Sequence, residues 1–437
     1  MVLPLADCSP NLEGIGSMAR SILACSMLAW LSTAPLFAGD WPQWQGLLRD
    51  GTSAETVTEW TEPPPVVWRH EVGTGYSSPV VSKGRVFVHA RVGSSQEEEL
   101  IAFDAITGEE QWREKYPRVA YNSVVGGGPA ATPTVVGNRV LTFGISGMLS
   151  CFQVETGQRL WQRNVYEDFK ATVPRFGVCC SPLVVGNHVL VSVGGKETAI
   201  AAFDLQTGDV VWKAFDEPAS TASPILYRAP GQEPSEATAL FVTSLRLLAI
   251  DPLDGRMSWD APQIFKPSGP APTPLAIDDV IVTSNSNDGT VATRVAVSAD
   301  GARAETLWVK KDVGGYFSSG VRCAKDRICL VTNVVMPLPV ASLRCLDLRT
   351  GKEYWTIPNA GYFHAGVIGL ANNRLLVLDD AGTLKLFEAG ETECRELAKA
   401  SICKGTLVTP AFANGLLYAR DGDELVCVRL GPGLSPF

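Results

Sequence analysis

Short apolar runs alternate with turn residues along nearly the whole chain. In one representative stretch, the turn at residues 136–139 (VGNR) leads into the apolar run 140–143 (VLTF). Apolar runs of this length, bounded by Gly, Asn, Asp and Pro, are typical of β-strands joined by tight turns. The 41 Gly and 29 Pro residues fit the same interpretation. The pattern therefore predicts an all-β fold.

One sequence motif, called the repeat phrase below, recurs through the chain: an apolar residue, Asp, two residues, Thr-Gly or Asp-Gly, three residues and Trp. It stands in full at residues 103–112, 203–212, 250–259 and 346–355. Three weaker copies lie at 152–161 (Gln for Asp), 297–308 (stretched) and 387–397 (Leu for Trp). Self-similarity of this kind is typical of repeat architectures, in which each repeat is one supersecondary unit.

Two further strand-like runs precede each phrase, so each repeat has four short strands. The first run usually opens with Ser-Pro or Thr-Pro, at residues 78–79, 132–133, 181–182, 223–224, 273–274 and 409–410. Successive Trp positions (68, 112, 161, 212, 259, 308 and 355) lie 44 to 51 residues apart. That spacing matches one blade of a β-propeller.

The phrase is expected to have a folding role in every blade. Gly provides the positive φ of the turn, Asp and Thr hydrogen-bond its backbone, and Trp packs between blades with its N–H directed to a carbonyl. The last repeat has three strands, while residues 66–72 form a Trp-bearing strand with no repeat ahead of it. Pairing the two completes one blade from both chain ends and hides the edge strands. The sequence thus predicts an eight-bladed β-propeller of four-stranded antiparallel blades.

Charge and the N-terminus narrow the setting. The formal net charge is −9 and no run of Lys or Arg exists, which disfavours nucleic acid and anionic membrane surfaces as partners. Arg20, the apolar run 21–31 and small residues before Gly39 predict an export signal, cleaved near Ala38, rather than a transmembrane helix. Lipidation at Cys25 is the alternative. We expect a signal region (1–38), an extension (39–64) and a monomeric propeller (65–437).

Cysteine and histidine suggest no metal site. Nine of the 11 Cys residues lie beyond the signal region, without CxxC pairs, and the four His residues are scattered. In an oxidising compartment some Cys residues could pair. Cys323 and Cys329 flank a short turn and could face each other across a hairpin.

On these repeats, the chain resembles the PQQ-like β-propeller proteins, named after pyrroloquinoline quinone. The resemblance covers residues 65–430 and implies an eight-bladed ring. The opening 40–44 (DWPQW), with 49–51 (RDG), is similar to that of a large subgroup of exported bacterial propellers. The family includes quinoprotein alcohol dehydrogenases and also non-enzymatic members, such as the propeller lipoprotein of the outer-membrane barrel-assembly machinery. The resemblance therefore implies the fold but leaves the activity open.

An enzyme hypothesis follows from that resemblance: a PQQ-dependent dehydrogenase with Ca²⁺. Quinoprotein alcohol dehydrogenases stack a vicinal disulfide on the cofactor, and Cys179 and Cys180 are adjacent here, next to Arg175. The alternative is that both Cys residues replace the small Ser residues seen in other blades. We favour the alternative, because the sequence lacks a grouped Glu/Asn/Asp ligand set and a haem-attaching CxxCH.

The favoured hypothesis is a non-catalytic binding or scaffold propeller. Residues just before each inner strand are expected near the mouth of the central channel, where aromatic and cationic side chains suit a protein, a peptide or a glycan. Loop packing is the alternative explanation for these residues. The candidate ligand-binding residues are Tyr76, Arg118, Tyr121, Arg175, Tyr316, Tyr362, His364 and Lys404, with Phe176, Phe317 and Phe363 beside them.

Overall fold

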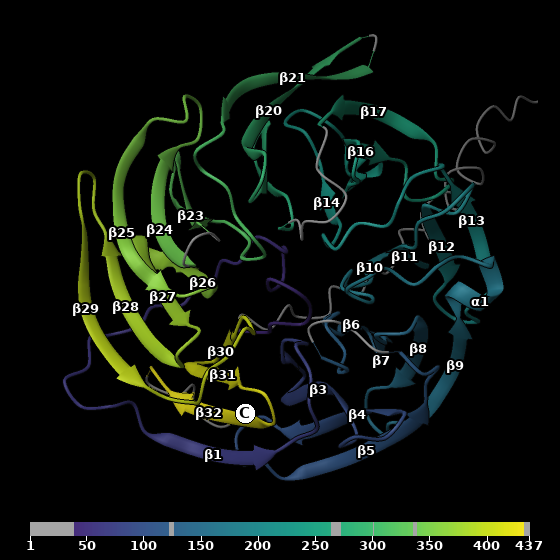
Figure 1. Ribbon diagram of the computed structural model, residues 1–437, viewed down its shortest axis with the longest axis horizontal. Coiled ribbons are helices and arrows are strands. Elements are labelled where there is room, and N and C mark those ends of the chain that lie inside the picture. Colours follow the sequence, from purple (N-terminus) through teal and green to yellow (C-terminus); the bar gives the residue numbers. More distant parts are fainter. Residues whose placement is uncertain (1–38, 122–125, 264–271, 300, 335–338, 432–437) are drawn as a thin grey trace, which may run out of the picture. The chain divides into compact units, whose positions relative to one another are not determined.

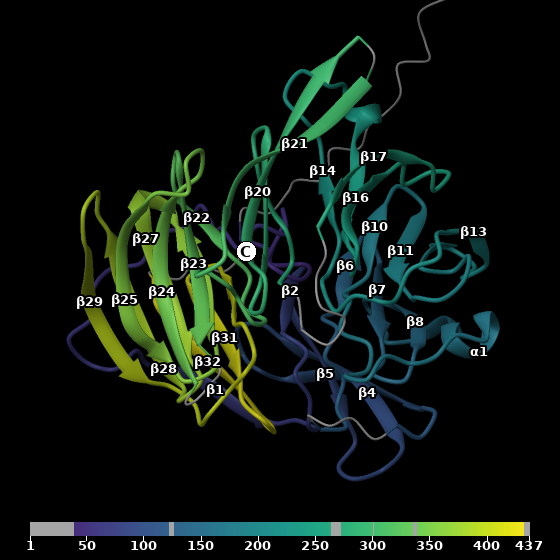
Figure 2. The same ribbon diagram turned by 45° about the horizontal axis from the view of Figure 1, so that its top comes forward.

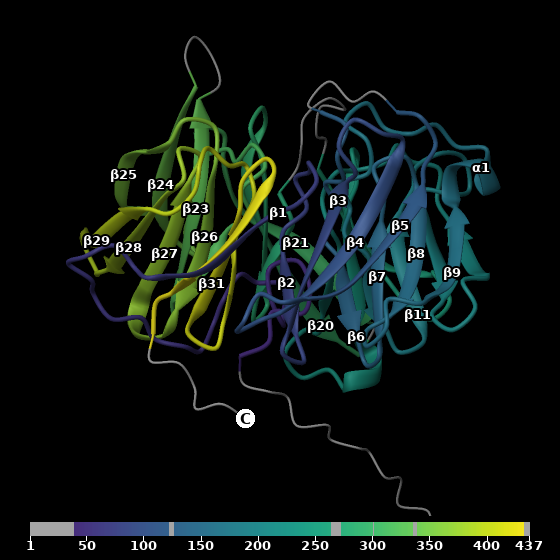
Figure 3. The ribbon, with the colours of Figure 1, turned by 90° about the horizontal axis from the view of Figure 1, so that it is seen from below.

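The computed structural model describes residues 39–431 apart from gaps at 122–125, 264–271, 300 and 335–338. The signal region and its cleavage site therefore lie outside the described residues. Within them, eight separate four-stranded antiparallel sheets follow one another in a ring, which confirms the eight-bladed propeller (Figure 1). Figure 3 shows the same ring from its side.

Seven blades run outward from the centre of the ring in chain order, and the eighth takes its outermost strand from the start of the propeller. The first, innermost strands are β2 (Val80–Ser82), β6 (Thr134–Val136), β10 (Leu183–Val185), β14 (Ile225–Tyr227), β18 (Leu275–Ile277), β22 (Val321–Ala324), β26 (Ala365–Leu370) and β30 (Ala411–Ala413). The second strands are β3 (Arg85–Arg91), β7 (Arg139–Phe143), β11 (His188–Ser192), β15 (Thr238–Val242), β19 (Val280–Asn285), β23 (Arg327–Val334), β27 (Arg374–Asp379) and β31 (Leu416–Arg420).

The two outer positions of the first seven blades carry the repeat phrase. The third strands are β4 (Glu97–Asp104), β8 (Met148–Gln153), β12 (Ile200–Asp204), β16 (Arg246–Ile250), β20 (Gly289–Ser298), β24 (Val340–Asp347), β28 (Thr383–Ala389) and β32 (Glu424–Arg429). The outermost strands are β5 (Glu110–Pro117), β9 (Arg159–Asn164), β13 (Val210–Ala214), β17 (Met257–Pro262), β21 (Gly301–Lys310), β25 (Glu353–Gly361), β29 (Cys394–Ser401) and β1 (Val66–Glu71). The hairpin of β20 and β21 extends out from the ring (Figure 2).

Little helix accompanies the strands. The described residues hold one short α-helix, α1 (Val165–Phe169), and two 3₁₀ turns, Pro234–Glu236 and Ala371–Asn373. None of these helices is long and apolar enough to cross a bilayer.

The recurring Trp and Gly residues join neighbouring blades as expected. Trp112 donates its indole N–H to the carbonyl of Val154 in the next blade, at 2.9 Å. Gly157, in the turn of that next blade, has φ +72°, and a Cβ added there would lie 2.5 Å from the Trp112 ring. Gly is therefore required both by the turn and by the Trp packed against it. The same indole-to-carbonyl bond recurs at Trp68, Trp161, Trp212, Trp308 and Trp355.

The ring closes through strands from both ends of the propeller. β1 pairs with β32 in the order β1-β32-β31-β30, so the strand ahead of the first repeat completes the last blade. Arg420 reinforces the seam: its buried guanidinium donates to the carbonyl of His89 in the first blade (2.7 Å) and to that of Gly73 in the connection between β1 and β2 (2.6 Å). The predicted closure is confirmed.

The segment ahead of β1 crosses the centre of the ring (purple in Figure 1). It bonds to the first blade through Trp41 and Val81, to the seventh through Ser53 and Gly369, and to the eighth through Glu55. These contacts lie on the inner strands or on the turns that leave them. The segment, residues 40–57, therefore covers one mouth of the channel and is called the N-terminal plug below.

Candidate functional site

A ring of hydroxyl groups surrounds the channel just before the inner strands. The backbone N–H of one blade donates to the Ser or Thr hydroxyl of the next, as from Thr132 to Ser181 and from Ser181 to Ser223, both at 2.9 Å. The bonds from Ser78 to Thr132 and from Thr273 to Ser319 follow the same rule. The repeated Ser-Pro and Thr-Pro pairs thus tie blades together around the channel, a role that the sequence analysis did not assign.

The N-terminal plug is anchored by a buried arginine. The Arg49 guanidinium donates to the carbonyl of Pro224 (2.8 Å), to the hydroxyl of Thr134 (3.2 Å) and to the carbonyl of Pro182. Burial lowers the pKa of Arg49 to about 10, so the side chain remains charged at neutral pH. One residue of the plug therefore holds three different blades.

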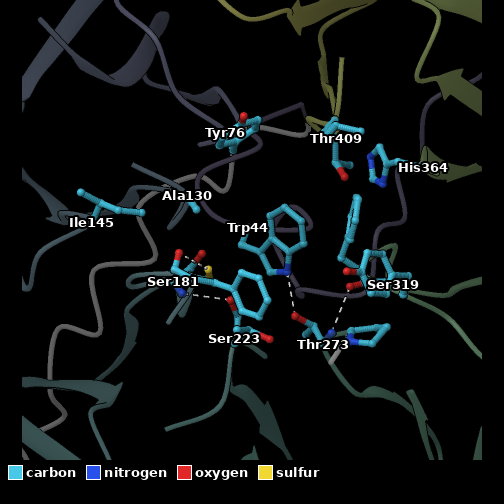
Figure 4. A pocket seen from close by; sticks show the side chains of 17 residues that line it. Trp44, Tyr76, Ala130, Ile145, Ser181, Ser223, Thr273, Ser319, His364 and Thr409 are labelled. Carbon is cyan, nitrogen blue, oxygen red and sulfur yellow. Dashed lines mark hydrogen bonds between the residues drawn. The ribbon is translucent and has the colours of Figure 1, made fainter. Parts of the chain in front are cut away.

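The other mouth leads into a cavity of about 200 Å³, called the central pocket below. Trp44 of the plug lies near its middle and donates to the Thr273 hydroxyl at 2.9 Å (Figure 4). All eight blades contribute to its wall, through residues at or just before their inner strands. The lining residues are Trp44, Tyr76, Ala130, Ile145, Phe176, Cys179, Ser181, Thr221, Ser223, Pro272, Thr273, Tyr316, Phe317, Ser319, His364, Leu407 and Thr409.

An aromatic stack forms one side of the central pocket. The rings of Tyr316 and Phe317 lie 4.9 Å apart, and Phe317 stacks on His364 at 5.1 Å. His364 Nδ1 is 2.7 Å from the Ser318 hydroxyl, while the buried Nε2 has no hydrogen-bond partner within the described protein. Burial lowers the pKa of His364 to about 4, so the imidazole is neutral at pH 7. It offers a ligand one unsatisfied ring nitrogen without a charge.

A second cavity of about 510 Å³ adjoins the first and shares Tyr76 and Leu407 with it. It is called the side pocket below. Tyr362 (54% exposed) and Phe363 (37%) stand at its edge, in T-shaped contact with ring centroids 5.0 Å apart. The Asp380 carboxylate holds their loop by accepting from the backbone N–H of Tyr362 at 2.8 Å. The two exposed rings are thus fixed by the backbone beneath them.

Four of the eight candidate binding residues line these two pockets. Tyr316 and His364 line the central pocket, Tyr362 lines the side pocket, and Tyr76 lines both. They come from blades that are far apart in the sequence, and the ring brings them to one mouth.

The other four candidates lie outside both linings. Arg118 is buried, with its guanidinium 3.6 Å from the Glu98 carboxylate. Tyr121 donates its hydroxyl to the carbonyl of Arg175 at 2.8 Å, and the Arg175 guanidinium lies over the ring of Phe176. The Lys404 side chain is 75% exposed, 3.8 Å from the Asp423 carboxylate. The positions of Arg118 and Tyr121 fit the loop-packing alternative, whereas Arg175 and Lys404 are exposed.

Cys179 and Cys180 are separate thiols that face different surroundings. Cys179 lines the central pocket, whereas Cys180 is buried and its sulfur accepts from the backbone N–H of Ser192 at 3.4 Å. Burial raises the pKa of both, to about 12 for Cys179 and about 11 for Cys180. Thiols of this kind pack as small apolar groups and are weak nucleophiles.

The lining of the central pocket does not fit a Ca²⁺-held quinone cofactor. Calcium takes six to eight oxygen ligands, with carboxylates prominent among them. None of the described lining residues carries a carboxylate, and none carries a cationic group that would meet the acid groups of the cofactor. The oxygens offered are the hydroxyls of Ser, Thr and Tyr.

Sequence reasoning missed Trp44 and Arg49 as channel residues. Both belong to the opening phrase that marks the exported subgroup, but the phrase lies outside every repeat, so no blade predicts its place. The available signal was two Trp residues, Trp41 and Trp44, followed by Arg49 within ten positions.

Comparison with known proteins assigns the chain to a family. The sequence profile described as "Outer membrane protein assembly factor BamB" matches residues 45–177 and 96–356. The chain belongs to this family. Outer membrane protein assembly factor BamB of Shewanella oneidensis is 24% identical over 384 residues, which cover 84% of this chain and 80% of that protein. Quinohemoprotein alcohol dehydrogenase ADH IIB of Pseudomonas putida is 26% identical over 135 residues, only 29% of this chain and 18% of the enzyme.

Solved structures of both kinds of relative, the assembly factor and the dehydrogenases, have the same propeller fold as this chain. BamB from Moraxella catarrhalis superimposes with a TM-score of 0.60 at 15% identity, covering 87% of this chain and all of that one. A europium-containing methanol dehydrogenase gives 0.65, also at 15% identity, with 91% and 90% covered. At this identity the likeness shows the fold alone, so the chemistry of the pockets must separate the two functions.

Proposed function

We propose that this BamB-family propeller is a non-catalytic scaffold in outer-membrane protein assembly, which binds a protein segment at its open mouth. The observation that carries the proposal is a pair of adjoining pockets walled by aromatic rings and hydroxyls, on the mouth opposite the N-terminal plug. The described lining of the central pocket offers neither a metal-ligand set nor an activated nucleophile, and the side pocket adds the carboxylates of Asp380 and Asp421. Export is part of the proposal, with residues 1–38 as signal region and residues 65–437 as the propeller.

The arrangement of the two pockets favours a protein segment over a compact small molecule. The side pocket, at about 510 Å³, falls within the roughly 300–1,000 Å³ typical of drug-sized ligands, but the central pocket, at about 200 Å³, is smaller. The central pocket suits one or two side chains. Because Tyr76 and Leu407 belong to both pockets, an extended segment can place one side chain in each while its backbone crosses the shared wall. Rigid aromatic residues such as Tyr362 are typical anchors of such contacts.

The hydrogen-bonding groups favour a neutral or weakly polar segment. His364 Nε2 is buried without a hydrogen-bond partner. A ligand group that forms a hydrogen bond with this nitrogen would gain about 1–3 kcal/mol of binding free energy. A glycan would also use the hydroxyls, but the apolar surface of Phe317 and Leu407 is better matched by apolar side chains.

Site-specific photo-cross-linking tests the proposal. A photoreactive phenylalanine derivative replaces Tyr362 at the open mouth, and in a control protein it replaces Leu253 (58% exposed), in the turn after β16 on the opposite face. Cells carrying each variant are irradiated and the adducts are identified by mass spectrometry. We expect an adduct with a component of the outer-membrane assembly machinery from position 362 and none from 253.

Two outcomes would reject the open mouth as the binding face. One is equal cross-linking from both positions. The other is a specific adduct at 253 but none at 362. A position-362 adduct that persists unchanged when Tyr316 is replaced by Ala would place binding in the side pocket alone.

A further inference from the structure

Three cysteine thiols meet inside the sixth blade. Cys323, Cys329 and Cys345 come from β22, β23 and β24, and all three are buried. Their sulfur atoms lie within 4.8 Å of one another, with Cys323 and Cys345 at 3.8 Å. The predicted hairpin between Cys323 and Cys329 exists, but Val321 is the residue opposite Cys329. The sequence spacing gave no sign of the cluster, because each thiol lies on a different strand.

Cys345 by itself follows the repeat. It lies on the third strand directly opposite Trp355, where a small residue is needed beneath the indole. Four other blades have Ala there and two have Cys: Ala102, Cys151, Ala202, Ala249, Ala292 and Cys427. A Cys at this position therefore needs no explanation beyond packing.

Cys329 departs from the repeat. It pairs with Cys345 across β23 and β24, at the position where every other blade has a larger side chain. Its counterparts are Phe87, Leu141, Leu190, Leu240, Val282, Leu376 and Tyr418. The sixth blade thus replaces a bulky core residue with a thiol, next to the thiol of Cys345.

Cys323 reaches the cluster through a β-bulge. The register of β22 against β23 shifts between Arg322 and Ala324, which leaves Cys323 as the extra residue. The other seven inner hairpins show no such shift. Bulges re-aim side chains and are kept where they have a use. Two independent departures from the repeat therefore bring two more sulfurs to Cys345.

The arrangement suits a soft metal ion held by sulfur alone. With metal–sulfur bonds of about 2.3 Å, a planar three-sulfur site has edges of about 4 Å, close to the 3.8 Å between Cys323 and Cys345. Thiolates select soft ions such as Cu(I), whereas structural zinc takes four ligands. The group offers three sulfurs and no His or carboxylate. We propose that Cys323, Cys329 and Cys345 form a buried trigonal site for a single Cu(I) ion.

Without metal, the three thiols differ in how readily they ionise. Hydrogen bonds from the Cys323 thiol, and then from that of Cys329, lower the pKa of Cys345. Burial raises the pKa of Cys329, and the pKa of Cys323, which the hydrogen bond with Cys329 lowers, is raised overall by its hydrogen bond with Cys345 and by burial. Binding would release thiol protons, so the affinity for Cu(I) would rise with pH.

A matched pair of variants tests the site. Cys345→Ala and Cys151→Ala change the same position of the repeat to its commonest residue, one inside the cluster and one in the second blade. The reduced full-length protein is titrated anaerobically with Cu(I) held by an excess of a colorimetric chelator. We expect Cys151→Ala to bind as much Cu(I) as the unchanged protein and Cys345→Ala to bind one equivalent less. Melting curves verify that both variants are folded.

Cys329→Val provides a second test, because Val282 occupies the same position in the fifth blade. It too should lose one equivalent, together with the sulfur-to-copper charge-transfer absorption. Equal Cu(I) uptake by all four proteins would overturn the proposal. So would four-coordinate Zn(II) held by these thiols in preference to Cu(I), or a disulfide between two of them that persists in protein isolated without reductant and excludes Cu(I). The binding of protein partners at the open mouth does not depend on either result.

Discussion

The two mouths of the channel differ in how completely their polar groups are satisfied. At the closed mouth, the N-terminal plug fills the opening and the Arg49 guanidinium bonds to groups from three blades. At the open mouth, Tyr362 is 54% exposed and the buried His364 Nε2 lacks a partner. Gln45 Oε1 in the plug is also buried without a partner, but the bonded Arg49 guanidinium contributes stability and is not free for a ligand. The open mouth combines exposed rings with an unsatisfied nitrogen, so binding energy remains available there.

The closed mouth also shows why a ring of similar blades needs a segment from outside the repeat. Each blade contacts only its neighbours, so a propeller lacks direct links between distant blades. The plug supplies them, since it bonds to the first blade through Trp41 and to the seventh through Ser53. We therefore expect the two mouths to respond differently to substitution.

Arg49→Ala should give the largest loss of stability. It leaves the Pro224 carbonyl buried without its donor, leaves the Pro182 carbonyl bonded to the Thr134 hydroxyl alone, and frees the plug, at a cost of about 3–5 kcal/mol in the free energy of unfolding. Urea denaturation measures this loss. The control is Arg294→Ala, because Arg294 is half-exposed and pairs with Asp279 and Glu305 at the surface. Such pairs contribute about 0–1 kcal/mol. Similar losses from both variants would show that the plug does not hold the ring.

His364→Asn should change how stability depends on pH. The folded protein holds the pKa of His364 at about 4, below the ordinary value of 6.5. As the pH falls from 6.5 to 4, His364 binds a proton in the unfolded chain but not in the folded protein. The free energy of unfolding therefore decreases, by about 3 kcal/mol at pH 4. Asn retains a group for Ser318 but does not titrate. The difference in unfolding free energy between the two proteins should therefore narrow toward acid. A difference that stays constant from pH 7 to 4 would contradict this assignment.

The fold was predictable because each blade repeats the same physical requirements. Trp112 needs an acceptor in the next blade, and Gly157 must leave room for its ring, so both recur wherever a blade meets another. The closure was predictable for a related reason: residues 66–72 carried a Trp strand without a partner, and the last repeat lacked one. Such signals are local in sequence and repeated many times.

The candidate site was predictable only in part. The position before an inner strand places a residue at the open mouth, and Tyr316 and His364 do line the central pocket. That position does not determine where a long side chain turns, however. Arg118 turns inward to Glu98, a partner 20 residues earlier on β4. The three-thiol cluster was not predictable, because a one-residue bulge at Cys323 decides whether its sulfur meets Cys345.

The smallest expected effect concerns the quinone cofactor. Saturating PQQ and Ca²⁺ should leave the melting temperature unchanged and should give no alcohol-dependent reduction of a dye. A ligand at 100 times its Kd would stabilise the protein by about 2.7 kcal/mol, an effect visible as a shift of several degrees. The described lining of the central pocket lacks the carboxylates that would hold Ca²⁺, and Cys179, which lines the pocket, is a separate thiol from its neighbour Cys180. A shift that disappears in Cys179→Ala would place a cofactor at the open mouth and would favour the dehydrogenase branch of the family over a scaffold. A shift retained in that variant would point to binding elsewhere, and the open mouth would remain the site for a protein segment.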